Sequence, residues 1–236
     1  MKRRLAWTAL ALSFSAGATD AFAFLLLGGV FTANMTGNLV LAGLTQRPGY
    51  PSMIVWIAVA IVVFVGVLYL TFRWTRTRTR RTLVIALVAG IAAQIVVLIG
   101  WIVLPHPLGL WLTAALLAPS ALAMAVQTAI SKRVENSSGV TTTYVTGTIT
   151  SIAADLADRN PQDLFTRCGV LIALVGGALS ASLLMNVSSV AAAALPAVPA
   201  VVGLALLLSV PASEYAPPPS VAGAATKGSG STGARA

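Results

Sequence analysis

The sequence predicts an all-α integral membrane protein whose six transmembrane helices form two inverted three-helix repeats. Of its 236 residues, 57% are hydrophobic and only 9% are charged, and the mean hydropathy is +0.89. This composition lies outside the range of soluble domains and is typical of multi-pass membrane proteins. The second observation is the placement of the basic residues, and the third is a pair of short polar motifs, one in each half of the chain.

Six mainly apolar segments are long enough to cross the hydrocarbon core of a bilayer, which is about 30 Å thick and takes about 20 helical residues. We therefore predict one membrane domain over residues 1–210, with repeat one at about 5–104 and repeat two at about 110–210. In chain order, the predicted spans are residues 5–30, 52–72, 83–104, 110–130, 165–187 and 190–210.

The basic residues predict how these spans are oriented. Fourteen of the fifteen Lys and Arg residues lie before span one, between spans two and three, between span four and the start of span five, or in the tail; the other is Arg47. The positive-inside rule then places both termini in the cytoplasm. We interpret the net charge of +9 as the result of this topology, not as a nucleic-acid surface.

The two ends of the chain have particular features. A basic start, an apolar run and Ala21-Phe22-Ala23 also resemble a secretory signal with its cleavage site. The apolar run continues to Val30, and cleavage would leave five spans, so we favour an uncleaved first span. Residues 211–236 are rich in Pro, Gly, Ala and Ser and predict a disordered cytoplasmic tail.

Two polar motifs occupy equivalent places in the two halves. Thr36-Gly37-Asn38 follows span one, with Asn34 in the same run, and Thr146-Gly147-Thr148 follows span four. Each precedes a segment too short to span, residues 39–44 and 149–157, so each repeat has a broken or half-helix after its first span. Because three spans per half is an odd number, the halves enter the membrane in opposite directions. Inverted repeats of this kind recur in secondary transporters.

These motifs have two interpretations. Thr and Asn cap helix N-termini well, and Gly permits unusual backbone shapes, so each motif can start a half-helix whose N–H groups and dipole face a shared polar cavity. In the alternative, the motifs are capped turns at the two membrane surfaces and start interfacial helices.

Two polar side chains lie within the spans that precede the motifs. Asp20 is about 22 Å along span one from its start, and a charged group in the membrane core costs ~2.5–3.5 kcal/mol on insertion scales. It should therefore face the bundle interior, either as a proton- or cation-coupling site or as a structural hydrogen-bond acceptor. Gln127 has the corresponding place in span four, and Gln94 in span three is typical of a hydrogen bond between helices.

Small residues recur at every fourth position on two spans, a pattern that lets helix backbones approach closely. We predict close helix packing along these two stripes, and Asp20 lies next to the first. The stripes are Ala9, Ser13, Gly17 and Ala21, and Gly169, Ala173, Gly177 and Ala181.

We see no basis for an enzyme. With one Cys (Cys168) and one His (His106, in a short turn between spans three and four), the chain offers neither a nucleophile–base set nor a structural metal site, and we expect no cofactor. Asp155 with Arg159, and Asp163 with Arg167, are predicted as exposed helical ion pairs.

The chain also resembles a known family. A-G-A-T-D-A-F-A-F-L-L-L-G-G-V-F-T-A-N-M-T-G-N-L-V-L-A-G-L in the first half and G-V-T-T-T-Y-V-T-G-T-I-T in the second are similar to the YoaK-like family of bacterial multi-pass membrane proteins of unknown function. The resemblance covers roughly residues 5–210 and implies an integral protein of the bacterial inner membrane, but it supplies no substrate.

From these features we predict a small-solute transporter or permease that binds a small molecule or an ion. Six short spans enclose little volume, which favours a homodimer. The alternative is a non-transporting membrane scaffold or sensor, in which the polar motifs only lock helices together. The candidate site residues are Asp20, Asn34, Thr36, Gly37, Asn38, Gln127, Thr146, Gly147 and Thr148.

Overall fold

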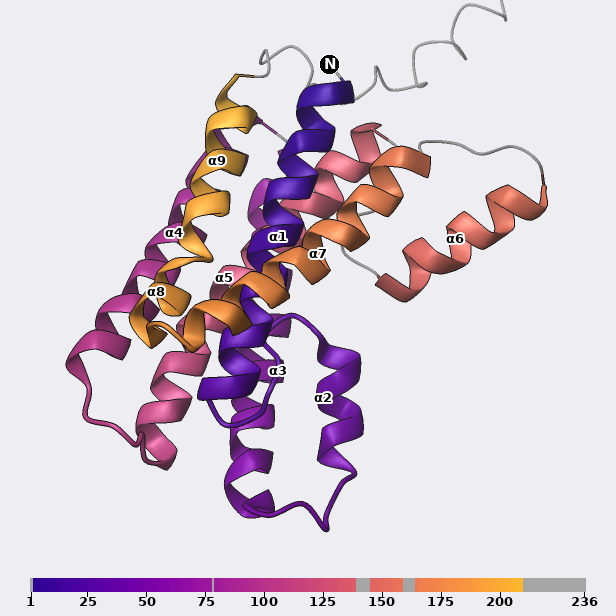
Figure 1. The fold of residues 1–236 in the computed structure, drawn as a ribbon. Helices are drawn as coiled ribbons and strands as arrows, with labels where there is room; N and C mark the ends of the chain where they lie inside the picture. Colours follow the sequence, from indigo (N-terminus) through magenta and orange to yellow (C-terminus); the bar gives the residue numbers. More distant parts are fainter. Residues whose placement is uncertain (1, 78, 139–144, 159–163, 210–236) are drawn as a thin grey trace, which may run out of the picture.

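The computed structural model describes residues 2–77, 79–138, 145–158 and 164–209, and over these ranges the chain forms helices and no strands (Figure 1). The predicted tail, residues 211–236, lies outside the described residues. In chain order the helices are α1 (Lys2–Leu26), α2 (Met35–Ala42), α3 (Tyr50–Trp74), the 3₁₀ turn η1 (Thr75–Thr77), α4 (Arg80–Val103), α5 (Leu110–Ser138), α6 (Val145–Ala157), α7 (Leu164–Met185), α8 (Ser189–Ala194) and α9 (Ala197–Leu208).

The prediction of six spans is confirmed. α1, α3, α4, α5, α7 and the α8–α9 pair are each long and apolar enough to cross a membrane, with mean hydropathies from 1.6 to 2.9. The first span ends earlier than predicted, at Leu26 and not Val30, because Gly28 and Gly29 adopt positive φ angles of 89° and 73°. Glycine reaches this region easily, and it ends the helix.

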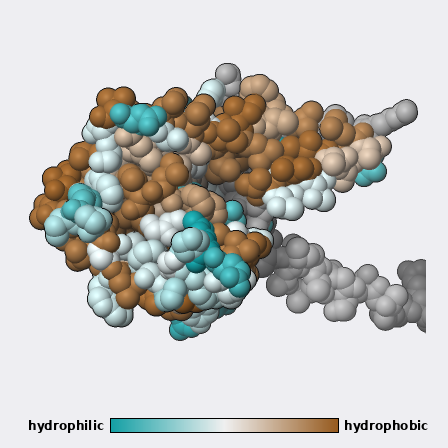
Figure 2. Space-filling view, turned by 60° about the horizontal axis from the view of Figure 1, so that its bottom comes forward, coloured by the Kyte–Doolittle hydropathy of each residue, from teal (hydrophilic) through white to brown (hydrophobic). Residues whose placement is uncertain are grey.

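α1 and α5 form the centre of the bundle. They have the lowest mean hydropathy of the six spans, 1.6 each, and the largest buried shares, 50% and 61%. The four outer spans are more hydrophobic, which follows from facing lipid instead of other helices. In Figure 2 hydrophobic side chains cover much of the sides, while the end that carries the α2–α3 connection is mostly polar.

Helix α7 crosses α1 at backbone contact distance, so the close packing predicted along each small-residue stripe is confirmed, and the structure shows that the two stripes lie at the same contact. A Cβ added to Gly17 would lie 1.9 Å from the Leu174 carbonyl oxygen, and one added to Gly177 would lie 2.0 Å from the Phe14 carbonyl oxygen. No larger residue fits at either glycine without separating the helices. The contact joins the first span of the chain to the fifth (Figure 1).

The last span is broken, which the sequence analysis did not predict. It starts at Ser189 and is interrupted at Leu195-Pro196, between α8 and α9. Proline removes a backbone donor and interrupts helical hydrogen bonding. At the break, the Pro196 carbonyl oxygen accepts a 2.8 Å hydrogen bond from the hydroxyl of Ser15 in α1, and Ser15 is fully buried.

Arginine side chains bind the carboxyl ends of two helices. Arg133 at the end of α5 donates to the Phe72 carbonyl oxygen of α3 over 2.7 Å. Arg4 donates to the Ser209 carbonyl oxygen over 2.5 Å, and Arg80 donates to that of Leu208. Because a helix C-terminus presents unpaired carbonyl oxygens and negative dipole, these cations stabilise the ends of α3 and α9.

Candidate functional site

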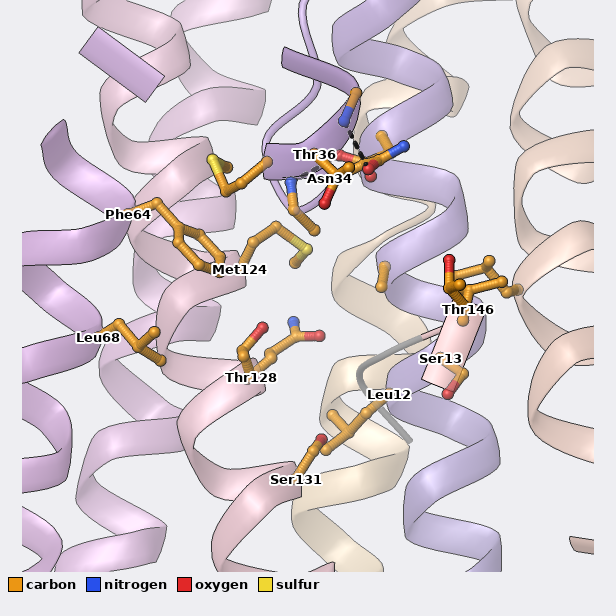
Figure 3. A pocket seen from close by; sticks show the side chains of 18 of the residues that line it. Leu12, Ser13, Asn34, Thr36, Phe64, Leu68, Met124, Thr128, Ser131 and Thr146 are labelled. Carbon is orange, nitrogen blue, oxygen red and sulfur yellow. Dashed lines mark hydrogen bonds between the residues drawn. The ribbon is translucent and has the colours of Figure 1, made fainter. Parts of the chain in front are cut away.

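A cavity of about 820 Å³ lies between the central helices and the two short helices α2 and α6. Figure 3 shows Asn34 and Thr36 at one end of it, Phe64 and Leu68 along one wall, and Thr146 across from them. The lining residues come from α1, α3, α5 and α7, from α2 with the residues before it, and from α6: Leu12, Ser13, Ala16, Asp20, Ala33, Asn34, Met35, Thr36, Gly37, Val40, Phe64, Leu68, Met124, Gln127, Thr128, Ser131, Val145, Thr146, Gly147 and Leu174.

Asp20 faces this cavity and also anchors the segment that leads into α2. Its Oδ1 atom accepts hydrogen bonds from the Thr32 amide (2.7 Å), the Thr32 hydroxyl (3.0 Å) and the Ala33 amide (2.9 Å). The segment between α1 and α2 is not helical, so these N–H groups have no helical partner. The carboxyl group therefore has a structural role, which the sequence analysis named as one of its two interpretations.

The N-cap of α2 is Asn34, two residues before the Thr36-Gly37-Asn38 motif. The Asn34 side-chain oxygen accepts a 3.0 Å hydrogen bond from the Gly37 amide. The short helix starts at Met35, so the motif forms its first turn, and the helix begins before the apolar segment 39–44 that follows the motif. A Cβ added to Gly37 would lie 2.9 Å from Asn34 Nδ2, so a larger residue there would displace the capping side chain.

Asn38 is fully buried and is not among the described residues that line the cavity. Its side chain pairs with the backbone of Phe31 in both directions: the Phe31 amide donates to Asn38 Oδ1 over 2.9 Å, and Asn38 Nδ2 donates to the Phe31 carbonyl oxygen over 2.7 Å. Asn38 thus replaces a missing backbone partner for the non-helical segment. A structural function explains its place in the motif.

The second motif lies at the same position in its own short helix. α6 begins at Val145, and Val145, Thr146 and Gly147 line the cavity, whereas Thr148 is buried outside the lining. As in α2, the motif belongs to the first turn of the short helix, which begins before the segment 149–157 that follows the motif. The Thr146 carbonyl oxygen accepts a 2.8 Å hydrogen bond from the Thr150 hydroxyl, one turn further along α6.

An ion pair ties α6 to α7. Arg167 Nη1 lies 2.5 Å from Asp155 Oδ2, and both side chains are largely shielded from solvent. The predicted partner of Arg167, Asp163, and that of Asp155, Arg159, lie outside the described residues. The ion pair of Arg167 with Asp155 joins two helices and holds the far part of α6 to the bundle.

Gln127 lies on the cavity wall within a buried hydrogen-bond cluster centred on Ser15. Gln127 Nε2 and Gln94 Nε2 both lie within hydrogen-bond distance of Ser15 Oγ, at 3.3 and 3.2 Å. The prediction that Gln94 bonds between helices is confirmed. Ser15 was missed, because a serine on an apolar helix carries no sign of the hydroxyl's partners, and the decisive one, Pro196, is 181 positions away.

Few side chains suited to metal binding or to acid–base chemistry lie near the cavity in the described part of the chain. No group of three His, Cys, Asp or Glu side chains that could hold a metal occurs within the described part of the chain. His106 is exposed in its turn, and its Nε2 atom lies 2.9 Å from the Trp101 carbonyl oxygen. Among the described cavity-lining residues, Asp20 is the one ionisable side chain.

Comparison with known proteins gives the family. The family model described as "Protein of unknown function (DUF1275)" matches residues 8–207. The chain belongs to this family. It is also 30% identical over 168 residues to the UPF0700 transmembrane protein YoaK of Bacillus subtilis (strain 168), an alignment that covers 69% of this chain and 74% of that protein. No solved structure matches. The resemblance to YoaK-like proteins is confirmed, and this member of the DUF1275 family is a multi-pass membrane protein.

Proposed function

We propose that this DUF1275 protein is a small-solute transporter or permease of the bacterial inner membrane, with both termini in the cytoplasm and no enzymatic activity. The observation that carries the proposal is that the first turns of α2 and α6, which are far apart in sequence, line one cavity together with Asp20 and Gln127. Its volume, about 820 Å³, is within the range of small-molecule sites, about 300–1,000 Å³.

An inverted repeat is part of the proposal, and the packing of the helices supports it. If a two-fold axis exchanges the halves, α1 exchanges with α5, α2 with α6, α3 with α7, and α4 with α9. The observed contacts obey this exchange: α1 packs on α7 as α5 packs on α3, and α1 packs on α9 as α5 packs on α4. Broken helices at the interface of such repeats form the sites of many secondary transporters.

We further propose that Asp20 couples transport to a proton or a cation. Asp20 is the one ionisable side chain among the described residues that line the cavity, and its Oδ1 atom holds the segment before α2 in place. A change in what the carboxyl group binds would therefore act on the position of a cavity wall. This mechanism joins the two interpretations of Asp20 that the sequence left open.

The scaffold or sensor remains the second candidate, and one observation favours it. Asp20 and Asn38 use their polar atoms to hold the segment between α1 and α2, which a purely structural motif would also require. The two functions differ in whether water and solutes reach the cavity, since a scaffold has no need of a wet interior.

Cysteine accessibility separates these candidates without a known substrate. In a Cys168→Ser background, Thr146→Cys and Asn34→Cys are placed on the cavity wall, and Ala125→Cys, at a fully buried position, is the control. For a transporter we expect a water-soluble, membrane-impermeant maleimide to label both wall positions and not the control. If a lipid-soluble maleimide labels the two wall positions and the impermeant maleimide does not, the result contradicts transport.

Transport itself is measured in proteoliposomes, as uptake of candidate solutes with and without a proton gradient. Asp20→Asn keeps an oxygen that can accept from Thr32 and Ala33, so the fold should persist while the pH dependence of uptake is lost. Unchanged pH dependence would refute the coupling function. A homodimer, also proposed, is tested by the mass of the detergent-solubilised protein.

A further inference from the structure

Two buried hydroxyl groups in the central helices are free to bind a ligand. A hydroxyl inside a membrane-spanning helix is commonly satisfied by the carbonyl oxygen one turn earlier in the same helix. Thr19 on α1 follows this pattern and donates to the Ser15 carbonyl oxygen over 2.7 Å. Ser13 on α1 and Thr128 on α5 do not. Among the contacts of the described residues, neither of these hydroxyls has a hydrogen bond, so both can donate and accept.

Both hydroxyls face the cavity. Ser13 and Thr128 line it, and only 4% and 9% of their surface is exposed. Their oxygen atoms retain accessible surface, whereas Oε1 of Gln127, which also has no partner in the described contacts, is enclosed. Ser131 lies one turn beyond Thr128, and Figure 3 shows these two residues across the cavity from Ser13. Because an unpaired buried hydroxyl is costly, this arrangement indicates a ligand or water that bonds to both walls.

The position of these groups in the membrane favours an uncharged ligand. Ser13 is nine residues after Arg4, the start of its span, and Thr128 is five residues before Arg133, the end of its span, so they lie about 14 and 8 Å along the helix axes. An ion at such depth is costly unless an opposite charge pairs with it. Among the described lining residues there is no Lys, Arg or His, and Oδ1 of Asp20 already accepts three hydrogen bonds.

The backbone of α6 suits the same kind of ligand. The first N–H groups of a helix have no carbonyl partner within it, and Val145, Thr146 and Gly147 of the first turn line the cavity. Such N–H groups can donate to the oxygen of an uncharged hydroxyl group as well as to an anion. Since a hydroxyl both donates and accepts, a ligand with several hydroxyl groups matches these amides and the free side chains of α1 and α5 alike.

One wall of the cavity is apolar. Phe64 and Met124 belong to one hydrophobic cluster and face the cavity, with Leu68 beside them (Figure 3). A polyol chain has C–H groups that can pack against such a wall while its hydroxyl groups turn to the polar side. The mixture of free hydroxyls and apolar side chains is therefore complementary to a polyol along its length.

We infer that the solute is an uncharged polyol, whose hydroxyl groups bond to Ser13 and Thr128 while its C–H groups pack against Phe64 and Met124. This inference rests on the proposed function. It specifies the class of substrate, which the transporter proposal by itself leaves open.

The test measures uptake of radiolabelled sorbitol and xylitol into proteoliposomes that contain the full chain, with protein-free liposomes as the blank. We expect saturable uptake of at least one of the two polyols. Gluconate and N-methylglucammonium carry the hydroxylated chain of sorbitol with a negative and a positive charge. Because an unpaired charge is penalised inside the membrane, each should compete at least about tenfold more weakly than the unlabelled polyol. Urea, which is uncharged but has no hydroxyl group, should not compete.

Thr128→Val removes a hydroxyl and keeps the shape of the side chain. It should raise the KM for the polyol about three- to tenfold, the effect of losing one uncharged hydrogen bond, and Ser13→Ala should do the same from the other wall. Thr19→Val is the matched control, because Thr19 is buried but its hydroxyl is satisfied by Ser15 and it is not a lining residue. Its KM should change by less than about twofold. If Thr128→Val does not fold, the comparison of Ser13→Ala with Thr19→Val decides.

The remaining outcomes separate this inference from the proposed function. Stronger competition by gluconate or N-methylglucammonium than by the polyol would overturn the inference and leave a transporter of a charged solute. Equal KM values for the hydroxyl variants and Thr19→Val, competition by urea, or uptake of neither polyol above the blank would overturn it as well. Failure of the impermeant maleimide to reach the cavity is what refutes the transporter itself.

Discussion

The contact between α1 and α7 allows a quantitative prediction for Gly17→Ala. The added Cβ would lie 1.9 Å from the Leu174 carbonyl oxygen and 2.8 Å from its carbonyl carbon. Both are backbone atoms and cannot rotate away. Since ordinary contacts of a Cβ begin at 3.4 Å, the helices must separate by about 1.5 Å. Gly177→Ala requires a similar separation, because its Cβ would lie 2.0 Å from the Phe14 carbonyl oxygen.

The expected loss of stability combines two opposing effects. Inserting a methyl group into a packed contact costs ~1–3 kcal/mol, and we take the upper end because the neighbour is rigid backbone. Alanine regains about 1 kcal/mol of helix propensity relative to glycine. The net loss of about 2 kcal/mol corresponds to a fall in Tm of roughly 4–8 °C for a chain of this size.

The assay is thermal unfolding in detergent, followed by circular dichroism, with two controls. Gly66→Ala is on α3 with nothing within 4 Å of the added atom, so its Tm should not fall. Gly169→Ala meets only the flexible end of the Leu10 side chain at 3.0 Å and should cost less than about 1 kcal/mol. The double variant Gly17→Ala/Gly177→Ala should lose less than the sum, because one separation relieves both clashes. Equal Tm values for Gly17→Ala and Gly66→Ala would refute the close packing.

Three further predictions concern the short helices. Asn34→Ala removes the N-cap of α2 and should cost about 1 kcal/mol, seen as faster hydrogen exchange at the start of that helix, whereas Asn34→Asp should retain protection. Asn38→Asp keeps the acceptor for the Phe31 amide but loses the donor to its carbonyl oxygen, so we expect a loss of about 2 kcal/mol in chemical unfolding; full stability would show that the pairing is dispensable. Arg167→Gln breaks the link to Asp155 and should lower stability by no more than about 1 kcal/mol while increasing proteolysis near α6; unchanged cleavage would mean that the pair does not hold this helix.

Much of the fold was predictable because the bilayer imposes simple constraints. The number of spans followed from the length of the apolar segments, and close helix packing on α1 and α7 followed from small residues at every fourth position, although not that these two helices are partners. The break at Leu195-Pro196 was missed, because the segment is apolar throughout and a proline inside a span can also be tolerated without a break, as Pro119 is in α5. At this break the buried Ser15 hydroxyl of α1 donates to the Pro196 carbonyl oxygen, a contact between distant residues that the local sequence does not reveal.

Most of the residues that the sequence predicted as a site line the cavity, but the sequence did not show which side chains of the two motifs face it. Asp20, Gln127 and the two motifs do line a common cavity, but Asn38 and Thr148 lie outside its lining. On a short helix, which side of the first turn faces the interior depends on the start residue, and the motifs alone do not determine that the helices start at Met35 and Val145. The unpaired oxygen of Gln127 could not be inferred, since it depends on how many donors converge on Ser15.

The contact of α1 with α7 also constrains how the protein is made. α1 ends at Leu26, and its closest neighbour starts at Leu164, 138 positions later. At synthesis rates of about 5–20 residues per second, α7 emerges roughly 7–28 s after α1. During that interval one of the two least hydrophobic spans, with Asp20 and a row of small residues, is in the membrane before its main partner exists. The insertion machinery or α5 must therefore shelter this helix until α7 is made. Fragments that end before α7 should insert less stably and be degraded by membrane proteases.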